Sequence, residues 1–132
     1  MKRRDLLTLS LALAAAPAVA KAGSAPSSSS GAPRYSRLAT LTATVVRSHG
    51  RRGVLSIEAG IDVADEGFRA VAVQSLPRLR AAYSQVVRNF GAAMIAGEVP
   101  NADRLARDLQ VATDETLGRR GAQLLLGTIL TN

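Results

Sequence analysis

Side chains that could carry chemistry are few in this chain. There is no cysteine, so the chain offers neither a thiol nucleophile nor a thiolate metal ligand. The one histidine, His49, stands between Ser48 and Gly50, and no further ligand lies beside it at the spacing that zinc sites use. No G-x-S-x-G segment occurs, so the turn that presents a nucleophilic serine in many hydrolases is missing. We therefore expect His49 to be an exposed loop residue, and we predict no catalytic residue.

One acidic cluster, formed by Asp62, Asp65 and Glu66, has two interpretations. Grouped carboxylates can bind a cation or act as an acid–base pair. The same residues also suit the end of a strand followed by a helix start, with Asp65 as the N-cap and Glu66 near the positive end of the helix dipole. The second interpretation is favoured because Asp65 and Glu66 already suit a helix start, and no calcium-loop pattern is present. We expect no metal and no cofactor.

A group of arginines, Arg47, Arg51 and Arg52, flanks the glycines of the segment RSHGRRG. They can form a solvated turn, or they can contact an anionic partner such as a lipid headgroup or peptidoglycan. From Gly23 onward the chain holds thirteen arginines and nine acidic residues, and this net charge of +4 allows attraction to anionic partners of this kind. A nucleic acid is not expected, because bases stack on aromatic side chains and the four aromatic residues are not grouped with the arginines.

The first 22 residues have the three parts of an export signal. A basic start is followed by a short apolar run over 6–20 and by small residues that match the A-x-A cleavage rule. This run is shorter than the roughly 20 residues that span a bilayer. Cleavage is predicted after Ala20 or Ala22. The stretch KRRDLLT, with Arg3 and Arg4, is similar to a twin-arginine signal, while the general export route and an uncleaved anchor are the alternatives.

Composition changes after the signal. Residues 23–33 are rich in Ser, Gly and Pro and are predicted to form a flexible linker. Residues 34–132 are then long enough for one small domain. Export places this domain in the periplasm, with no permanent membrane span.

Hydrophobic periodicity predicts the elements of the domain. Residues 38–47 and 53–63 alternate between apolar and polar side chains, which indicates two half-buried strands joined by a hairpin with a basic tip. We expect the apolar residues of each strand to face inward. In the first strand these are Ala39, Leu41, Ala43 and Val45. In the second strand they are Leu55, Ile57, Ala59, Ile61 and Val63. Gly50 and Gly53 are available for positive φ. The closing segment, 122–132, is apolar on both faces and is predicted to be a buried strand.

Helical spacing follows the hairpin. One stripe comprises Phe68, Val71 or Ala72, Ser75 or Leu76, Leu79, Tyr83, Val86 and Phe90, and Pro77 is expected either to kink this helix or to start a new one. Arg78, Arg80 and Arg88 are assigned to its solvated side. A second helix, capped by Asn101 and Gly118, has the stripe Ala102, Leu105, Leu109, Ala112 and Leu117. The sequence thus predicts a single small α+β domain of order β-β-α-α-β, with the helices on one face of the sheet.

This order and its residues resemble the periplasmic domain of the flagellar basal-body-associated FliL family. The likeness covers residues 38–132 and rests on the strand GVLSIEAGIDVAD, the turn Leu76-Pro77-Arg78 in SLPRLRAAYSQVV, the helix RLARDLQVATDETL and the closing strand QLLLGTILTN. The resemblance implies a protein that is not an enzyme, binds no cofactor and assembles beside membrane machinery.

Two functions are therefore expected from the sequence. The first is association with an envelope or basal-body complex, in which exposed sheet edges could also pair two copies into a homo-oligomer. The alternative is a periplasmic binding module for an anionic envelope component, acting through Arg47, Arg51 and Arg52.

Overall fold

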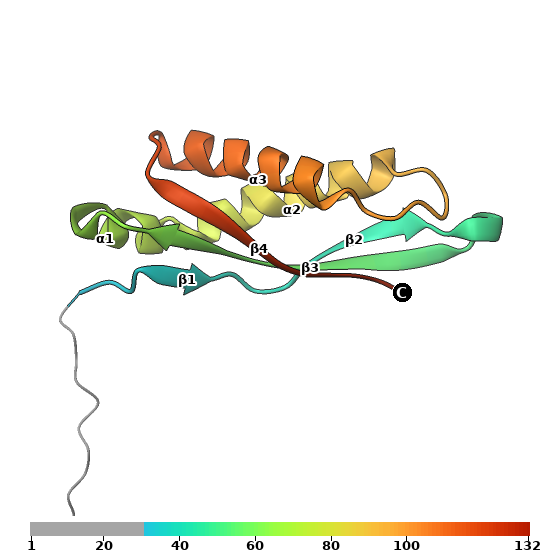
Figure 1. Ribbon diagram of the computed structural model, residues 1–132, viewed down its shortest axis with the longest axis horizontal. Coiled ribbons are helices and arrows are strands. Elements are labelled where there is room, and N and C mark those ends of the chain that lie inside the picture. Colours follow the sequence, from blue (N-terminus) through green and yellow to red (C-terminus); the bar gives the residue numbers. More distant parts are fainter. Residues whose placement is uncertain (1–30) are drawn as a thin grey trace, which may run out of the picture.

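A four-stranded antiparallel sheet forms one layer of the protein and helices cover one of its faces (Figure 1). The computed structural model describes residues 31–132, so Arg3, Arg4, Ala20, Ala22 and most of the predicted linker lie outside the described residues. In chain order the elements are β1 (Tyr35–Arg37), β2 (Leu41–Val46), the short 3-10 helix η1 (Ser48–Gly50), β3 (Arg52–Val63), α1 (Glu66–Gln74), α2 (Leu76–Ala93), α3 (Ala102–Leu117) and β4 (Ala122–Thr131). The predicted α+β class is confirmed, with one more strand and one more helix than expected.

Strand β3 is the centre of the sheet. Ile57 pairs with Leu41 of β2 on one side and with Ile129 of β4 on the other. Because β1 pairs with β3 beyond the end of β2, both short strands share one edge of β3. The outer edges of the sheet are therefore formed by β1 and β2 on one side and by β4 on the other.

An irregularity between β1 and β2 changes which residues face the helices. Arg37 lies opposite Gly60 and Leu41 lies opposite Ile57, so one extra residue is inserted between these two pairs. A bulge of this kind shifts the alternation of side chains by one position. Ala39 is exposed as a result, contrary to the prediction. The buried positions along this edge are Ser36, Leu38, Leu41, Ala43 and Val45.

Strand β4 is an edge strand, which corrects the prediction of a buried one. Its pairing with β3 leaves its other edge outside the sheet, and the helices cover only one of its faces. Ala122 and Leu124 are buried, whereas Leu125 and Leu130 are 42% and 54% exposed. Both faces of β4 are apolar although only one is buried: Ala122 and Leu124 face the helices, whereas Leu125 and Leu130 lie on the uncovered side of the sheet.

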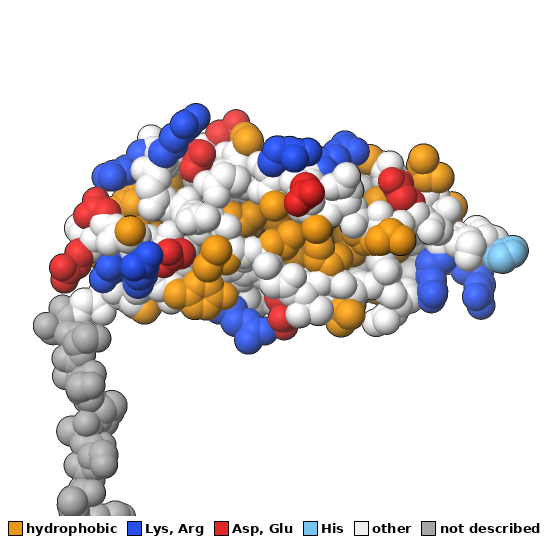
Figure 2. Space-filling view, viewed as in Figure 1, with side chains coloured by type: hydrophobic (Ala, Val, Ile, Leu, Met, Phe, Trp, Pro, Cys, Tyr) orange, Lys and Arg blue, Asp and Glu red, His pale blue; other side chains and the backbone are white. Residues whose placement is uncertain are grey.

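The helical run is divided at Ser75. Pro77 lies in the first turn of α2, where a proline costs little because the first N–H groups of a helix have no intrahelical partner. The interpretation in which Pro77 starts a new helix is thus confirmed. Figure 2 shows charged side chains of both signs along the outer surface of the helix layer.

Three positions of the predicted helical stripes differ. Val87, four residues after Tyr83 and three before Phe90, is buried where Val86 was expected, and Val86 is half-buried at the border of the same stripe. Ala102 is exposed in the first turn of α3, whose buried residues begin at Leu105. Leu117, the last residue of α3, is half-buried.

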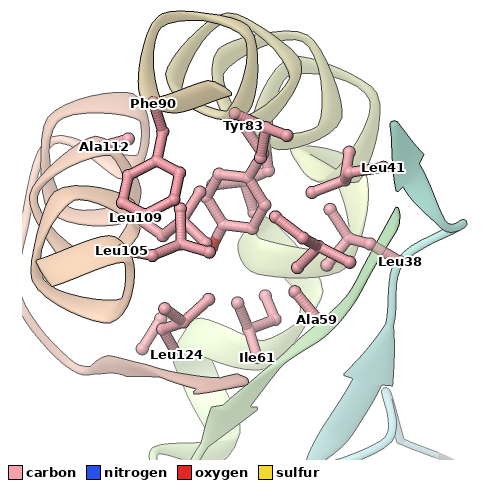
Figure 3. Packing of buried hydrophobic residues seen from close by; sticks show 14 of the residues in the cluster. Leu38, Leu41, Ala59, Ile61, Tyr83, Phe90, Leu105, Leu109, Ala112 and Leu124 are labelled. Atoms are coloured by element: carbon pink, nitrogen blue, oxygen red, sulfur yellow. The ribbon is translucent and has the colours of Figure 1, made fainter. Parts of the chain in front are cut away.

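The core lies between the sheet and the helices (Figure 3). Ile57 and Leu79, both expected in the core, are fully buried. Tyr83 of α2 is also fully buried and its hydroxyl bonds that of Thr113 on α3. Thr113 Oγ1 in turn donates to the Leu109 carbonyl at 2.7 Å, so the Tyr83 hydroxyl must be the donor in its bond to Thr113.

Local caps agree with the sequence at three helix ends. Asp65 Oδ1 accepts from the Gly67 N–H at 3.1 Å, and Asn101 Oδ1 accepts from the Arg104 N–H at 3.0 Å. Gly118 ends α3 in the left-handed region with φ 71°.

Candidate binding surfaces

The basic hairpin tip forms as predicted. Arg47, Arg51 and Arg52 are exposed around η1, and no ion pair of these three side chains is described within residues 31–132. His49 is exposed there and has φ 67°, a conformation that L-residues adopt at a cost. His49 and Gly50 supply the left-handed turn instead of Gly50 and Gly53. Gly53 lies in β3, where a Cβ atom would approach the Asn132 carbonyl and the Arg47 side chain too closely.

The acidic cluster is divided among structural contacts. Asp65 caps α1 and lies 3.5 Å from Arg119, while Glu66 occupies the first turn of α1. Asp62 forms an ion pair with Arg34 on the face of the sheet that the helices leave uncovered. Among residues 31–132 no group of three or more carboxylate or imidazole side chains is arranged to hold a metal ion.

Arg34 and Asp62 form a two-point ion pair, with Nε–Oδ1 at 2.8 Å and Nη2–Oδ2 at 3.1 Å. The hydrogen bond from Arg34, aided by its charge and that of Arg69, holds the pKa of Asp62 below its ordinary value. A lowered folded-state pKa adds stability that is present above the unfolded pKa and is lost as the pH falls through the folded one.

Replacing Arg34 with glutamine is therefore expected to raise the pKa of Asp62 toward its ordinary value. NMR titration of the carboxyl carbon would measure this shift. The side chain of Arg34 is 63% exposed, so solvent screens the pair and we expect little change in stability at neutral pH. An unchanged Asp62 titration would show that the pair does not persist in solution.

The remaining candidates from the sequence have structural roles or remain in solvent. Arg78 donates to Ser75 Oγ at 3.1 Å and Arg88 donates to Gln85 Oε1 at 2.7 Å, both on α2, while Arg80 is exposed. Tyr83 and Phe90 are core residues and not part of a ligand cage.

The uncovered face of the sheet is a surface that the sequence did not reveal. We call it the open face; its exposed large apolar side chains are Tyr35, Val46, Val54, Leu125 and Leu130. Tyr35, Val46, Val54 and Leu125 alternate with buried residues of their strands, so they point away from the helices. Leu130 lies on the same face because it pairs with Ser56, which stands between the buried Leu55 and Ile57. Isolated exposed apolar residues are ordinary, but several on one sheet face are typical of a contact surface.

These apolar side chains form two groups. At one end Tyr35 lies over Gly60, where a Cβ atom would collide with the phenol ring, and Leu125 is the partner of Gly60 on β4. At the other end Val46, Val54 and Leu130 lie on neighbouring strands. Between the groups are Thr and Ser side chains and the ion pair between Arg37 and Glu58. A polar centre with apolar groups on both sides could orient a partner.

The outer edge of β4 is partly closed by a side chain. Gln110 of α3 donates from Nε2 to the Ala122 carbonyl at 2.9 Å and accepts from the Leu124 N–H at 2.8 Å. Its carboxamide thus takes the place of a peptide group on a neighbouring strand. From Leu126 onward, no backbone partner on this outer side is described within residues 31–132.

No model of a known protein family, no curated protein and no solved structure matches this chain. Within the described part of the chain no helix is long and apolar enough to cross a membrane. The function is therefore inferred from the open face and the basic hairpin tip.

Proposed function

We propose that this protein is an exported, non-catalytic domain that works by associating with other proteins of the cell envelope. The observation that supports the proposal is the open face, on which five large apolar side chains are exposed across the four strands. Burying such side chains against a partner gives a favourable hydrophobic contribution. The signal-like residues 1–22 support the periplasm as the compartment.

The flagellar basal body is the envelope complex that we propose. The support for it is the resemblance of residues 38–132 to the FliL periplasmic domain. Association between two copies of this chain is a second form of the same proposal, since the outer parts of β2 and β4 can accept a further strand.

A charge placed on the open face tests the proposal. Val54→Arg is expected to lower recovery of crosslinked partners from intact cells by about tenfold or more, equivalent to at least about 1.4 kcal/mol of binding free energy. The reason is that an arginine forced into a desolvated apolar contact has no opposite charge to pair with. Val111→Arg is the matched control, because Val111 is a valine of similar exposure on α3 (55% against 47% for Val54).

Both variants should keep the parent melting temperature, because each replaces an exposed side chain. Sedimentation of the purified protein reports any self-association, and swimming of a deletion strain carrying each variant reports a flagellar role. Equal partner recovery with Val54→Arg and Val111→Arg would exclude the open face as the contact. Unaltered swimming in the deletion strain would exclude the basal body as the partner.

A further inference from the structure

The end of the molecule at the β2–β3 hairpin combines exposed charge with exposed apolar surface. We call this the hairpin end, formed by Arg47, His49, Arg51 and Arg52 of the hairpin and by Ile95 and Val99 of the α2–α3 loop. Ile95 and Val99 are 74% and 82% exposed, the largest values among the large apolar side chains of the described residues. In Figure 2 the pale-blue histidine lies at the extremity, with blue side chains beside it and hydrophobic ones on the same end of the molecule.

The apolar loop is held against the basic hairpin by specific contacts. The Gly97 N–H donates to the Val46 carbonyl at 3.3 Å, and Gly97 has φ 80°, where Ser48 is its nearest neighbour. The turn is closed by two bonds between Ile95 and Glu98: the Ile95 N–H donates to Glu98 Oε2 at 2.9 Å, and the Glu98 N–H donates to the Ile95 carbonyl at 2.9 Å. Ile95 and Val99 are therefore presented by an ordered turn and not by a loose loop.

The charge at this end is positive. The hairpin end has three arginines and one nearby acidic residue, Glu98, whose carboxylate accepts a hydrogen bond from the Ile95 N–H. The four ion pairs described within residues 31–132 use other arginines: Arg34, Arg37, Arg104 and Arg119. The guanidinium groups of the tip thus remain available to an anionic partner.

We propose that the hairpin end binds the surface of an anionic lipid bilayer. Arginines attract the phosphates of anionic headgroups, and aliphatic side chains beside them can enter the boundary between headgroups and acyl chains. A cell-wall polymer of sugars and peptides would pair with the arginines but would leave Ile95 and Val99 in water. The pairing of basic and aliphatic side chains on one end therefore favours lipid.

The hairpin end adjoins only the near end of the open face, where Arg52 pairs with Val46 across β3 and β2. The hairpin lies at one extremity of the long axis, whereas the open face runs along that axis on the side away from the helices (Figure 1). Binding to a bilayer through the hairpin end would leave the far end of the open face, with Tyr35 and Leu125, accessible to a protein partner.

The absence of cysteine allows a test that reports on single positions. Val99→Cys in the full chain would be labelled with a dye whose emission shifts to the blue in apolar surroundings, and then titrated with phosphatidylglycerol vesicles or phosphatidylcholine vesicles. We expect a blue shift with the anionic vesicles that is weakened by 0.5 M salt, since such salt screens charges beyond a few ångströms. The matched control is the same dye at Val111→Cys on α3, which should not shift.

The arginines are tested in the labelled protein. Changing Arg47, Arg51 and Arg52 together to glutamine is expected to weaken the vesicle affinity reported at position 99 by about tenfold or more. All three side chains are exposed, so an unchanged melting temperature serves as the folding check.

Three results would overturn the proposal. They are no shift at position 99 with anionic vesicles, an equal shift at positions 99 and 111, or an equal affinity after the arginines are changed. Arginine-dependent sedimentation with isolated peptidoglycan, without a dye shift on vesicles, would assign the hairpin end to the cell-wall polymer instead. None of these results depends on whether Val54→Arg alters partner recovery.

Discussion

Replacing Ile57 with alanine is expected to destabilise the protein by about 2–5 kcal/mol. Ile57 is fully buried at the centre of β3, with Leu41 and Ile129 as its partners on the two neighbouring strands. The truncation removes buried methyl groups and leaves a cavity between the sheet and the helices, which the close-packed surroundings fill only in part. Chemical denaturation followed by circular dichroism would measure the change in unfolding free energy.

The same strand supplies a control. Val54→Ala shortens an apolar side chain of β3 on the open face, where it is 47% exposed, and should cost much less. Leu79→Ala, from the fully buried face of α2, should resemble Ile57→Ala. If Ile57→Ala and Val54→Ala were equally mild, the assignment of the two sheet faces would be wrong.

Thr113→Val is expected to destabilise the protein by about 1–3 kcal/mol, although the two side chains are nearly equal in shape. The substitution removes the acceptor of the buried Tyr83 hydroxyl, and a buried donor without a partner loses its hydration without compensation. Tyr83→Phe should cost less, because the Thr113 hydroxyl keeps its bond to the Leu109 carbonyl.

A double-mutant cycle isolates this pair. The variant carrying both Tyr83→Phe and Thr113→Val should be less destabilised than the sum of the two single variants, because neither orphaned polar group remains. Strictly additive changes would mean that the two hydroxyls do not interact in solution.

Alkaline pH tests the burial of the Tyr83 hydroxyl. Burial raises the pKa of Tyr83 above its ordinary value. Since the folded-state pKa is raised, this contribution to stability is complete below the unfolded pKa of tyrosine, about 10, and is lost as the pH rises through the folded value. Tyr83→Phe should therefore lose less stability than the parent protein when the pH is raised in that range.

Much of the local structure was predictable from the sequence, because it depends on neighbours in the chain. Asp65 and Asn101 accept from N–H groups two and three residues further on, and Gly118 ends a helix through its own backbone conformation. Alternation along 53–63 fixed the buried face of β3, since successive side chains of a strand point to opposite sides. The basic hairpin tip followed from the same reasoning.

Other features were decided only when distant segments met. Tyr83 and Thr113 are 30 residues apart. Thr113 lies four residues after Leu109 on the buried side of α3, but its polar side chain kept it out of the predicted apolar stripe. Strand β4 is as apolar as a buried strand, but its pairing with β3 on one side alone makes it an edge. Its exposed leucines then become part of the open face.

The hairpin end combines residues that the sequence identified with residues that only the tertiary structure places there. Its arginines could be recognised from the segment RSHGRRG alone, since their spacing places them on one turn. Ile95 and Val99 lie more than forty residues further along the chain, and the packing of Gly97 against Val46 and Ser48 brings them to the same end of the molecule as those arginines. Local propensities, turns and caps were thus set by the sequence itself. The composition of both candidate binding surfaces was set by tertiary contacts, because each surface joins side chains from elements that no local pattern links.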